Sequence, residues 1–121
     1  MSSYKDLDIY KMAFELSIKV HKLSLDLPKF ELYEQGSQIR RSSKSVKDNI
    51  AEGYGRKRYK ADFIKFLVYA QASSDECLNQ IETIIELYTE KKDWIKLQSE
   101  FNILGMKINK FIQYVENNWK S

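Results

Sequence analysis

The chain has 121 residues, of which 43% are hydrophobic, 31% charged and 13% aromatic, and its formal net charge is only +3. This length is that of one ordinary domain, which buries about two thirds of its unfolded surface, so a second domain is excluded. One proline and four glycines also exclude a disordered, collagen-like or turn-rich β protein, and they favour a mostly helical fold.

Cys77 is the only cysteine, so no disulfide can form within one chain. Secreted domains of this size usually carry several disulfides, and we therefore expect a reducing, cytoplasmic location. Asp6 and Asp8 interrupt the N-terminal segment, which does not resemble a signal peptide. The longest unbroken apolar run, residues 66–70, is far shorter than the ~20 residues that span a membrane, so the sequence predicts a soluble protein.

The first predicted helix covers about residues 7–27. Its apolar residues recur at steps of three and four, which places them on one face of a helix. They are Ile9, Met12, Leu16, Val20, Leu23 and Leu27. Asp6 is a suitable N-cap, and Pro28 is expected to end the helix because the residue before a proline avoids the α-helical conformation.

The second predicted helix covers about residues 32–53, and Gly53 and Gly55 are expected to end it. Its inward-facing positions are Ile39, Ser43, Val46 and Ile50. A neighbouring flank is small or polar, with Ser42, Ser45, Asn49 and Gly53. Small residues let another helix approach closely, so this flank predicts a tight contact, either within the chain or with another subunit.

The third and fourth predicted helices, about residues 60–91 and 94–119, have the most regular patterns. In the third, steps of four and three alternate over about four heptads, through Phe63, Leu67, Ala70, Ser74, Cys77, Ile81, Ile84 and Tyr88. The fourth repeats this spacing with Trp94, Leu97, Phe101, Leu104, Ile108, Phe111 and Val115. Such a pattern requires a helical partner. Lys91 and Lys92 would complement the end of the third helix, and Asp93 would cap the fourth.

Four helices with short connections predict an all-α fold: an antiparallel up-down-up-down four-helix bundle, with a single domain over residues 1–121. Three helices also carry further apolar residues outside these lines: Phe14, Ile18, Leu25, Ile64, Val68, Leu78, Ile85, Ile95 and Ile112. Either broad apolar faces complete the core of one bundle, or these extra lines meet other subunits.

Positive charge is concentrated in one segment of the chain. Between Ser37 and Lys60 the net charge is +6, whereas the rest of the chain carries −3. All four arginines lie in this window, and the forked arginine side chain matches phosphate in geometry. The cations are Arg40, Arg41, Lys44, Lys47, Arg56, Lys57, Arg58 and Lys60.

On a helical wheel one flank of the second helix is basic, while Arg41 points outward. The members of this flank are Arg40, Lys44 and Lys47. The flank leads into the loop at 56–60, where Tyr54 and Tyr59 alternate with cations, a composition suited to stacking on unpaired bases. Three interpretations stay open: a nucleic-acid interface, a site for an acidic protein, or a solvated face that pairs with acidic stripes such as Glu82, Glu86 and Glu90.

No pattern of catalytic or metal-binding residues is evident. His21 is the only histidine and is expected at the surface, so one chain cannot assemble a histidine pair, a zinc site or a Ser/His/Asp triad. Cys77 lies on the inward line and is expected to be a small buried hydrophobe. The segment 53–55 lacks the spacing of a phosphate-binding loop and is better explained as a helix C-cap. We expect no enzyme, no metal and no cofactor.

One short motif is similar to that of a known family. It comprises Asn49, Ile50, Ala51, Glu52, Gly53, Tyr54, Gly55 and Arg56. Together with residues 6–13, 37–43, 63–67 and 73–76, it resembles the bacterial four-helix-bundle family first recognised as products of intervening sequences inside 23S rRNA genes. The resemblance covers nearly the whole chain.

The resemblance implies a homopentameric bundle, usually of unassigned activity. A related branch, the accessory proteins of diversity-generating retroelements, is understood to form basic pentamers that engage a reverse transcriptase and nucleic acid. By analogy, RNA or DNA would contact Arg40, Arg41, Lys44, Lys47 and Arg56. Lys57 and Arg58 complete the predicted nucleic-acid surface. The alternative is a protein-interaction or scaffolding module without a nucleic-acid ligand.

Overall fold

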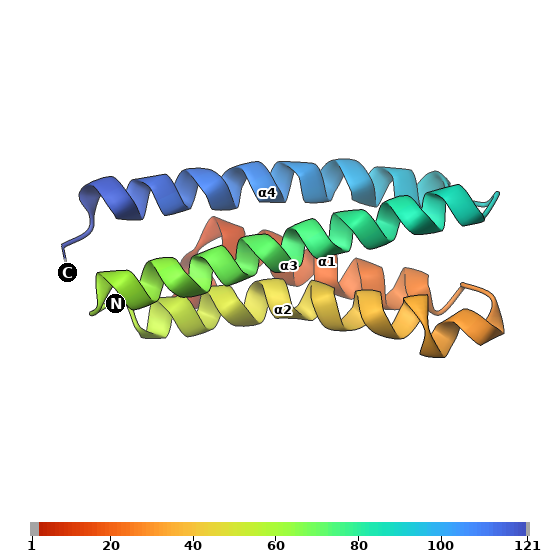
Figure 1. Cartoon of the computed structure of the whole chain (residues 1–121), viewed down its shortest axis with the longest axis horizontal. Coiled ribbons are helices and arrows are strands. Elements are labelled where there is room, and N and C mark those ends of the chain that lie inside the picture. Colours follow the sequence, from red (N-terminus) through yellow and green to blue (C-terminus); the bar gives the residue numbers. More distant parts are fainter. Residues whose placement is uncertain (1–2, 121) are drawn as a thin grey trace.

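Four long helices run alternately up and down in a computed structural model that describes residues 3–120 (Figure 1). They are α1 (Asp8–Ser24), α2 (Gln35–Gly55), α3 (Lys60–Leu87) and α4 (Lys92–Asn118). Two short 3₁₀ helices, η1 (Tyr4–Asp6) and η2 (Lys29–Tyr33), precede α1 and α2. The predicted all-α, up-down-up-down four-helix bundle is confirmed. Residues 1, 2 and 121 of the predicted domain lie outside the described residues.

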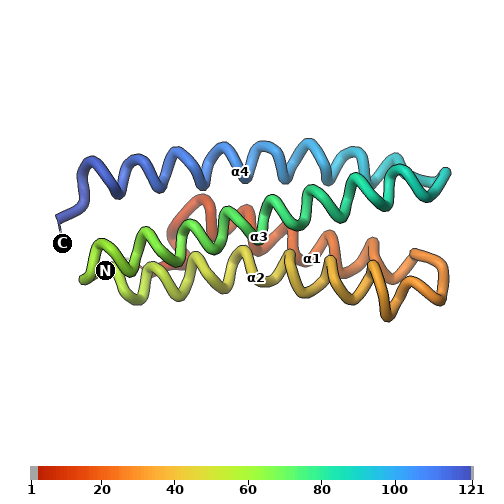
Figure 2. Tube along the Cα trace, in the orientation of Figure 1, coloured from red at the N-terminus to blue at the C-terminus, as the bar shows by residue number. Residues whose placement is uncertain are grey.

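The connections divide between the two ends of the bundle. Figure 2 shows the α1–α2 and α3–α4 connections at one end, and the α2–α3 loop near the C-terminus at the other. The most extensive helix contact is between α2 and α3, whereas α1 and α4 share the least extensive contact of the four neighbouring pairs. Each helix therefore packs beside its neighbours in the chain, as short connections require.

The regular patterns of α2, α3 and α4 fill the core. All the predicted inward residues of α2 are buried, as are those of α3 up to Ile84 and those of α4 except Phe111. In α4 the predicted Phe111 is only half-buried, and the next residue, Ile112, is buried instead. In α1 the small Ala13 is buried instead of the predicted Met12. Small residues, including Ser17 and Ser24, are buried on α1, whose contact with α2 is more extensive than its contact with α4.

The ends of α1 and α2 differ from the prediction. The first helix ends at Ser24 rather than next to Pro28, because the peptide N–H groups of residues 25–27 form short-range turn hydrogen bonds. The segment that follows forms η2, so α2 begins at Gln35 rather than near residue 32. Leu7, not Asp6, is the N-cap of α1, since the Asp6 carboxylate accepts a hydrogen bond from the Ser3 N–H in the capping box of η1.

The third helix is shorter than predicted, so the connection between α3 and α4 is longer. The third helix ends at Leu87 because Tyr88 is extended and its hydroxyl donates a hydrogen bond to the buried Glu31 carboxylate of η2. This hydrogen bond raises the pKa of Tyr88 to about 12. The Lys91 Nζ donates a hydrogen bond to the Ile85 carbonyl at 3.4 Å, in the last turn of α3, as predicted for a cation at this end. Lys92 already belongs to α4, so its predicted role is wrong, and Asp93 lies within the first turn of α4 rather than at its cap.

The extra apolar residues are not all covered by one core. Ile112 is buried, and three of the α3 residues are half-buried. Exposed fractions of 40–55% are found for Phe14, Ile18, Leu25, Val68 and Ile95. None of the helices within residues 3–120 combines the length and the apolar character needed to cross a membrane. A single chain therefore presents apolar ridges on an otherwise polar surface.

Candidate nucleic-acid interface

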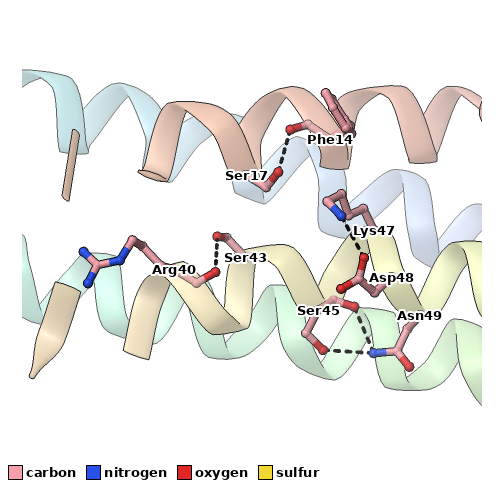
Figure 3. Close-up of polar contacts among 8 residues, drawn as sticks. All are labelled: Phe14, Ser17, Arg40, Ser43, Ser45, Lys47, Asp48 and Asn49. Atoms are coloured by element: carbon pink, nitrogen blue, oxygen red, sulfur yellow. Dashed lines mark hydrogen bonds and ion pairs between the residues drawn. The ribbon is translucent and has the colours of Figure 1, made fainter. Parts of the chain in front are cut away.

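The Arg40 guanidinium forms hydrogen bonds within the chain. Its Nη1 donates a hydrogen bond to the Ser24 hydroxyl at 2.9 Å, and its Nη2 donates to the Leu32 carbonyl at 2.6 Å. The side chain thus ties α2 to the end of α1 and to η2. Figure 3 labels two cations of the basic flank, Arg40 and Lys47, and it shows the Arg40 guanidinium extended away from Lys47. The two charges do not converge on one point of the surface.

Lys44 and Lys47 lie along the seam between α1 and α2. The Lys44 Nζ is 3.2 Å from the Nδ1 atom of His21, which is half-buried here rather than exposed on the surface. The Lys47 Nζ forms an ion pair with the Asp48 Oδ1 at 2.7 Å and lies 5.9 Å from the Phe14 ring centroid (Figure 3). The predicted basic flank therefore packs partly against α1.

Arg41 faces the opposite neighbour of α2. It is exposed and lines a shallow pocket between α2 and α3, together with Gln38, Ser45 and Glu76. Within residues 3–120 the Arg41 guanidinium has no ion-pair partner. Arg41 is thus free for a ligand, but α2 separates it from the Arg40 side chain.

The α2–α3 loop brings the remaining cations next to aromatic rings. The Arg56 guanidinium carbon lies 4.8 Å from the Phe66 ring centroid, and its nitrogens pair with Glu52 at 3.5 Å and Asp62 at 3.7 Å. The Lys57 Nζ lies 3.8 Å from the Tyr54 centroid. We call Lys57, Arg58 and Tyr59 the loop cluster, in which Arg58 and Tyr59 are exposed and Lys57 is half-buried.

Arg58 and Tyr59 form the outer part of the loop cluster. The Arg58 guanidinium carbon lies 5.9 Å from the Tyr59 ring centroid, and this ring is 60% exposed. Neither Lys57 nor Arg58 has a carboxylate partner among residues 3–120. The predicted continuous stripe is therefore divided into the α1 seam, the α3 side with Arg41, and the loop cluster.

Trp119 supports the loop cluster, a role that the helical pattern did not indicate. Its Nε1 donates a hydrogen bond to the Lys57 carbonyl at 2.9 Å, and its ring packs edge to face on Phe63 with centroids 5.2 Å apart. The Lys60 Nζ also donates to the Glu116 carbonyl at 2.7 Å. The end of α4 thus holds the loop, although these contacts join residues about 60 positions apart in the sequence.

The small flank of α2 packs against α3 of the same chain. Of the two predicted alternatives, a contact within the chain and a contact with another subunit, the structure has the first. The Ser42 hydroxyl donates to the Gln80 Oε1 at 2.6 Å, and the Ser45 and Ser73 hydroxyls are 2.9 Å apart. Asn49 donates to both the carbonyl and the hydroxyl of Ser45, at 2.9 Å and 3.0 Å. These bonds satisfy polar groups in the most extensive helix contact of the bundle.

Gly53 acts as a point of close approach rather than a C-cap. Gly53 and Gly55 both lie inside α2, Arg56 is the C-cap, and no glycine among the described residues has a positive φ. A Cβ atom at Gly53 would lie 3.1 Å from the Phe66 Cβ and 3.3 Å from the Phe63 carbonyl oxygen. The motif at residues 49–56 therefore contributes to the α2–α3 packing.

Replacing Gly53 tests this contact. Both Gly53→Ala and Gly55→Ala gain about 1 kcal/mol of helix propensity, but only Gly53→Ala forces an added methyl group into α3. We expect Gly53→Ala to have a free energy of unfolding about 1–3 kcal/mol below that of Gly55→Ala, measured by urea denaturation. Equal stability of the two variants would contradict a packing role.

Arg40 and Arg41 provide a second matched pair. Arg40→Met removes donors from the Ser24 hydroxyl and the Leu32 carbonyl, so we expect the free energy of unfolding to fall by about 1–3 kcal/mol. Arg41→Met alters an exposed side chain, and the expected change is within about 0.5 kcal/mol. Urea titrations of both variants measure the difference. A larger loss from Arg41→Met would refute this assignment.

Cys77 is buried, as predicted for a small hydrophobic residue. Burial raises the pKa of its thiol from 9.0 to about 12, although the Ser42 hydroxyl 3.2 Å away acts in the opposite direction. Since the thiol ionises more readily after unfolding, its contribution to stability is present below pH 9 and is lost as the pH rises toward 12. Within residues 3–120 no group of three acidic, histidine or cysteine side chains is arranged to hold a metal ion.

The buried thiol predicts slow modification. At pH 8 the native protein is expected to leave Cys77 unmodified by an aromatic disulfide reagent, because the reactive thiolate is disfavoured and the sulfur is inaccessible. In concentrated urea the same reagent is expected to titrate one thiol per chain. Absorbance of the released thiolate measures both reactions, and rapid modification of the native protein would show that the site opens.

The bundle, its α2–α3 packing motif and the basic loop define a helical-bundle protein without an evident catalytic centre in the described residues. The model of the family described as 23S rRNA-intervening sequence protein matches residues 5–110, and the chain belongs to this family. No protein of curated function matches the sequence. The family resemblance found in the sequence is thereby confirmed, while the relation to retroelement accessory proteins stays a prediction.

A solved structure has a similar fold. It is the crystal structure of a protein of unknown function from the S23 ribosomal protein family of Bacteroides thetaiotaomicron VPI-5482. The match has a TM-score of 0.74 and 22% sequence identity, and it covers 87% of this chain and 95% of that one. At this identity the similarity supports the fold alone.

Proposed function

We propose that this protein is a non-catalytic, self-associating bundle that binds RNA or another nucleic acid through the loop cluster. The observation that carries this proposal is the pairing of unneutralised cations with tyrosine rings at an exposed turn, where Arg58 lies beside the 60% exposed Tyr59. Cations along a strand contact phosphates, while an exposed aromatic ring stacks on an unpaired base. The ligand class that fits both features is single-stranded nucleic acid.

Arg41 and Lys44, on the α3 side and the α1 side of α2, are proposed as further phosphate contacts outside the loop cluster. Both lack a carboxylate partner within residues 3–120, unlike Lys47 and Arg56, whose charges are partly neutralised by neighbouring carboxylates. Arg40 is assigned a structural role instead. Affinity then comes mainly from counterion release, so it depends on a few cations and falls as salt is added.

Self-association is supported by the apolar ridges that one bundle leaves exposed, among them Phe14, Leu25 and Val68. Five copies are the expected number, as the family resemblance implies. The proposal keeps the cytoplasmic location that the single cysteine predicts. An assembly of this kind would present several loop clusters at once and so raise the apparent affinity for a long strand.

A charge reversal tests the loop cluster. We expect Lys57→Glu/Arg58→Glu to weaken binding of a fluorescent oligouridylate by about tenfold or more in low salt, and to lower the salt slope, which is about 0.7 per phosphate contact for single strands. The control is Lys96→Glu/Lys110→Glu, which changes the charge by the same amount at exposed positions of α4 on the side next to α1. Fluorescence anisotropy across a salt series measures both.

The outcome separates two classes of function. No binding by the wild-type chain at low salt, or equal binding by the two double variants, would overturn the nucleic-acid proposal. In that case the protein-interaction or scaffolding module becomes the better description. A further variant, Tyr59→Ala, is expected to weaken binding about tenfold with an unchanged salt slope, because stacking adds affinity without releasing counterions.

A further inference from the structure

An exposed stripe along α1 and its C-cap combines apolar and basic residues. It consists of Lys11, Phe14, Ile18, Lys22 and Leu25, all exposed to solvent. The three apolar members have exposed fractions of 45%, 40% and 55% in chain order. Neither lysine has an ion-pair partner within residues 3–120. The α1 stripe is therefore a ridge of uncovered apolar surface with a positive charge near each end.

A complementary stripe runs along the outside of α3. It consists of Ala72, Asp75, Asn79, Glu82 and Glu86, spaced by steps of three and four and all exposed. This line lies opposite the buried line of the same helix, and half-buried Leu78 and Ile85 flank it. Its three carboxylates have no ion-pair partner among the described residues. The charges of the α3 stripe are thus not neutralised within the chain.

One chain cannot bring the two stripes together. The α1 helix packs on α2 and α4, and Figure 1 shows α3 in front of the bundle with α1 behind it, so the outer faces of α1 and α3 point away from each other. The two helices nevertheless run in the same direction. Lys11 and Lys22 are as far apart in sequence as Asp75 and Glu86, about 16 Å along a helix.

We propose that the partner of both stripes is a second copy of this chain, with the α1 stripe of one copy lying parallel to the α3 stripe of the next. Lys11 then faces Asp75 of the neighbouring copy and Lys22 faces Glu86. Between these charges, Phe14 lies against Leu78 and the aliphatic stems of the glutamates. This inference rests on the self-association proposed above and assigns the surfaces that produce it.

Charge decides against a two-fold contact. Pairing α1 with α1 would oppose lysines, and pairing α3 with α3 would oppose carboxylates, so both symmetric arrangements are repulsive. Pairing of unlike stripes is heterologous, because each copy uses one face for each of two neighbours. Such an assembly grows until its rotation closes a ring, which is consistent with an odd number of subunits.

The test uses two double variants and their mixture. One is Lys11→Glu/Lys22→Glu and the other is Asp75→Lys/Glu86→Lys, with Lys57→Glu/Arg58→Glu, at the end of the bundle, as the control. Light scattering after size-exclusion chromatography measures molar mass, and circular dichroism checks that helicity is kept. We expect the wild type and the control to assemble, and each stripe variant alone to elute as a single chain of 14.4 kDa.

Mixing the two stripe variants is expected to restore assembly, because Glu on α1 then faces Lys on α3 and the unaltered faces also match. The chain with all four changes is expected to assemble by itself. Stripe variants that keep the wild-type mass, or a mixture that stays monomeric, would overturn this interface while leaving self-association in place. A monomeric wild type would overturn both, and its binding of oligouridylate would still be decided by the loop-cluster variants.

Discussion

The close contact between α2 and α3 is the constraint on which the rest of the structure depends. Gly53 leaves room for the backbone of α3 at Phe63, and hydrogen bonds such as that from Ser42 to Gln80 satisfy the polar groups that this approach buries. Large side chains on this flank would hold the helices apart. The contact places the α2–α3 loop at the end of the bundle, where Trp119 from α4 can hold it.

This packing divides a basic segment into parts with different roles. A cation close to a neighbouring helix becomes a structural donor, as Arg40 does toward Ser24 and Leu32. On the loop, Arg58 lies beside the Tyr59 ring and has no carboxylate partner among the described residues. At the opposite end of the bundle, the hydrogen bond from the Tyr88 hydroxyl to the buried Glu31 carboxylate links the α3–α4 connection to the α1–α2 connection. Ligand binding is therefore proposed only where cations are left without a carboxylate partner among the described residues.

Assembly and ligand binding are proposed to use separate surfaces. The stripes lie along the outer faces of α1 and α3, whereas the loop cluster lies at one end of the bundle. Copies that pair along parallel helices would present their loop clusters at the same end of the assembly. A strand that crosses several copies could then contact several clusters, which links the two proposals without making either depend on a shared residue.

The sequence by itself determined the four helices and most of the core, because residues on a buried helical face repeat at a fixed period that no neighbour can change. It did not determine which side of α1 is buried, where Ala13 replaces Met12, or that Gly53 serves a close approach instead of a cap. Tertiary structure decided these points. A helical wheel gives the direction of a side chain, whereas the distance to a neighbouring helix decides whether a charge such as that of Arg40 or Arg41 is used inside the fold or left at the surface.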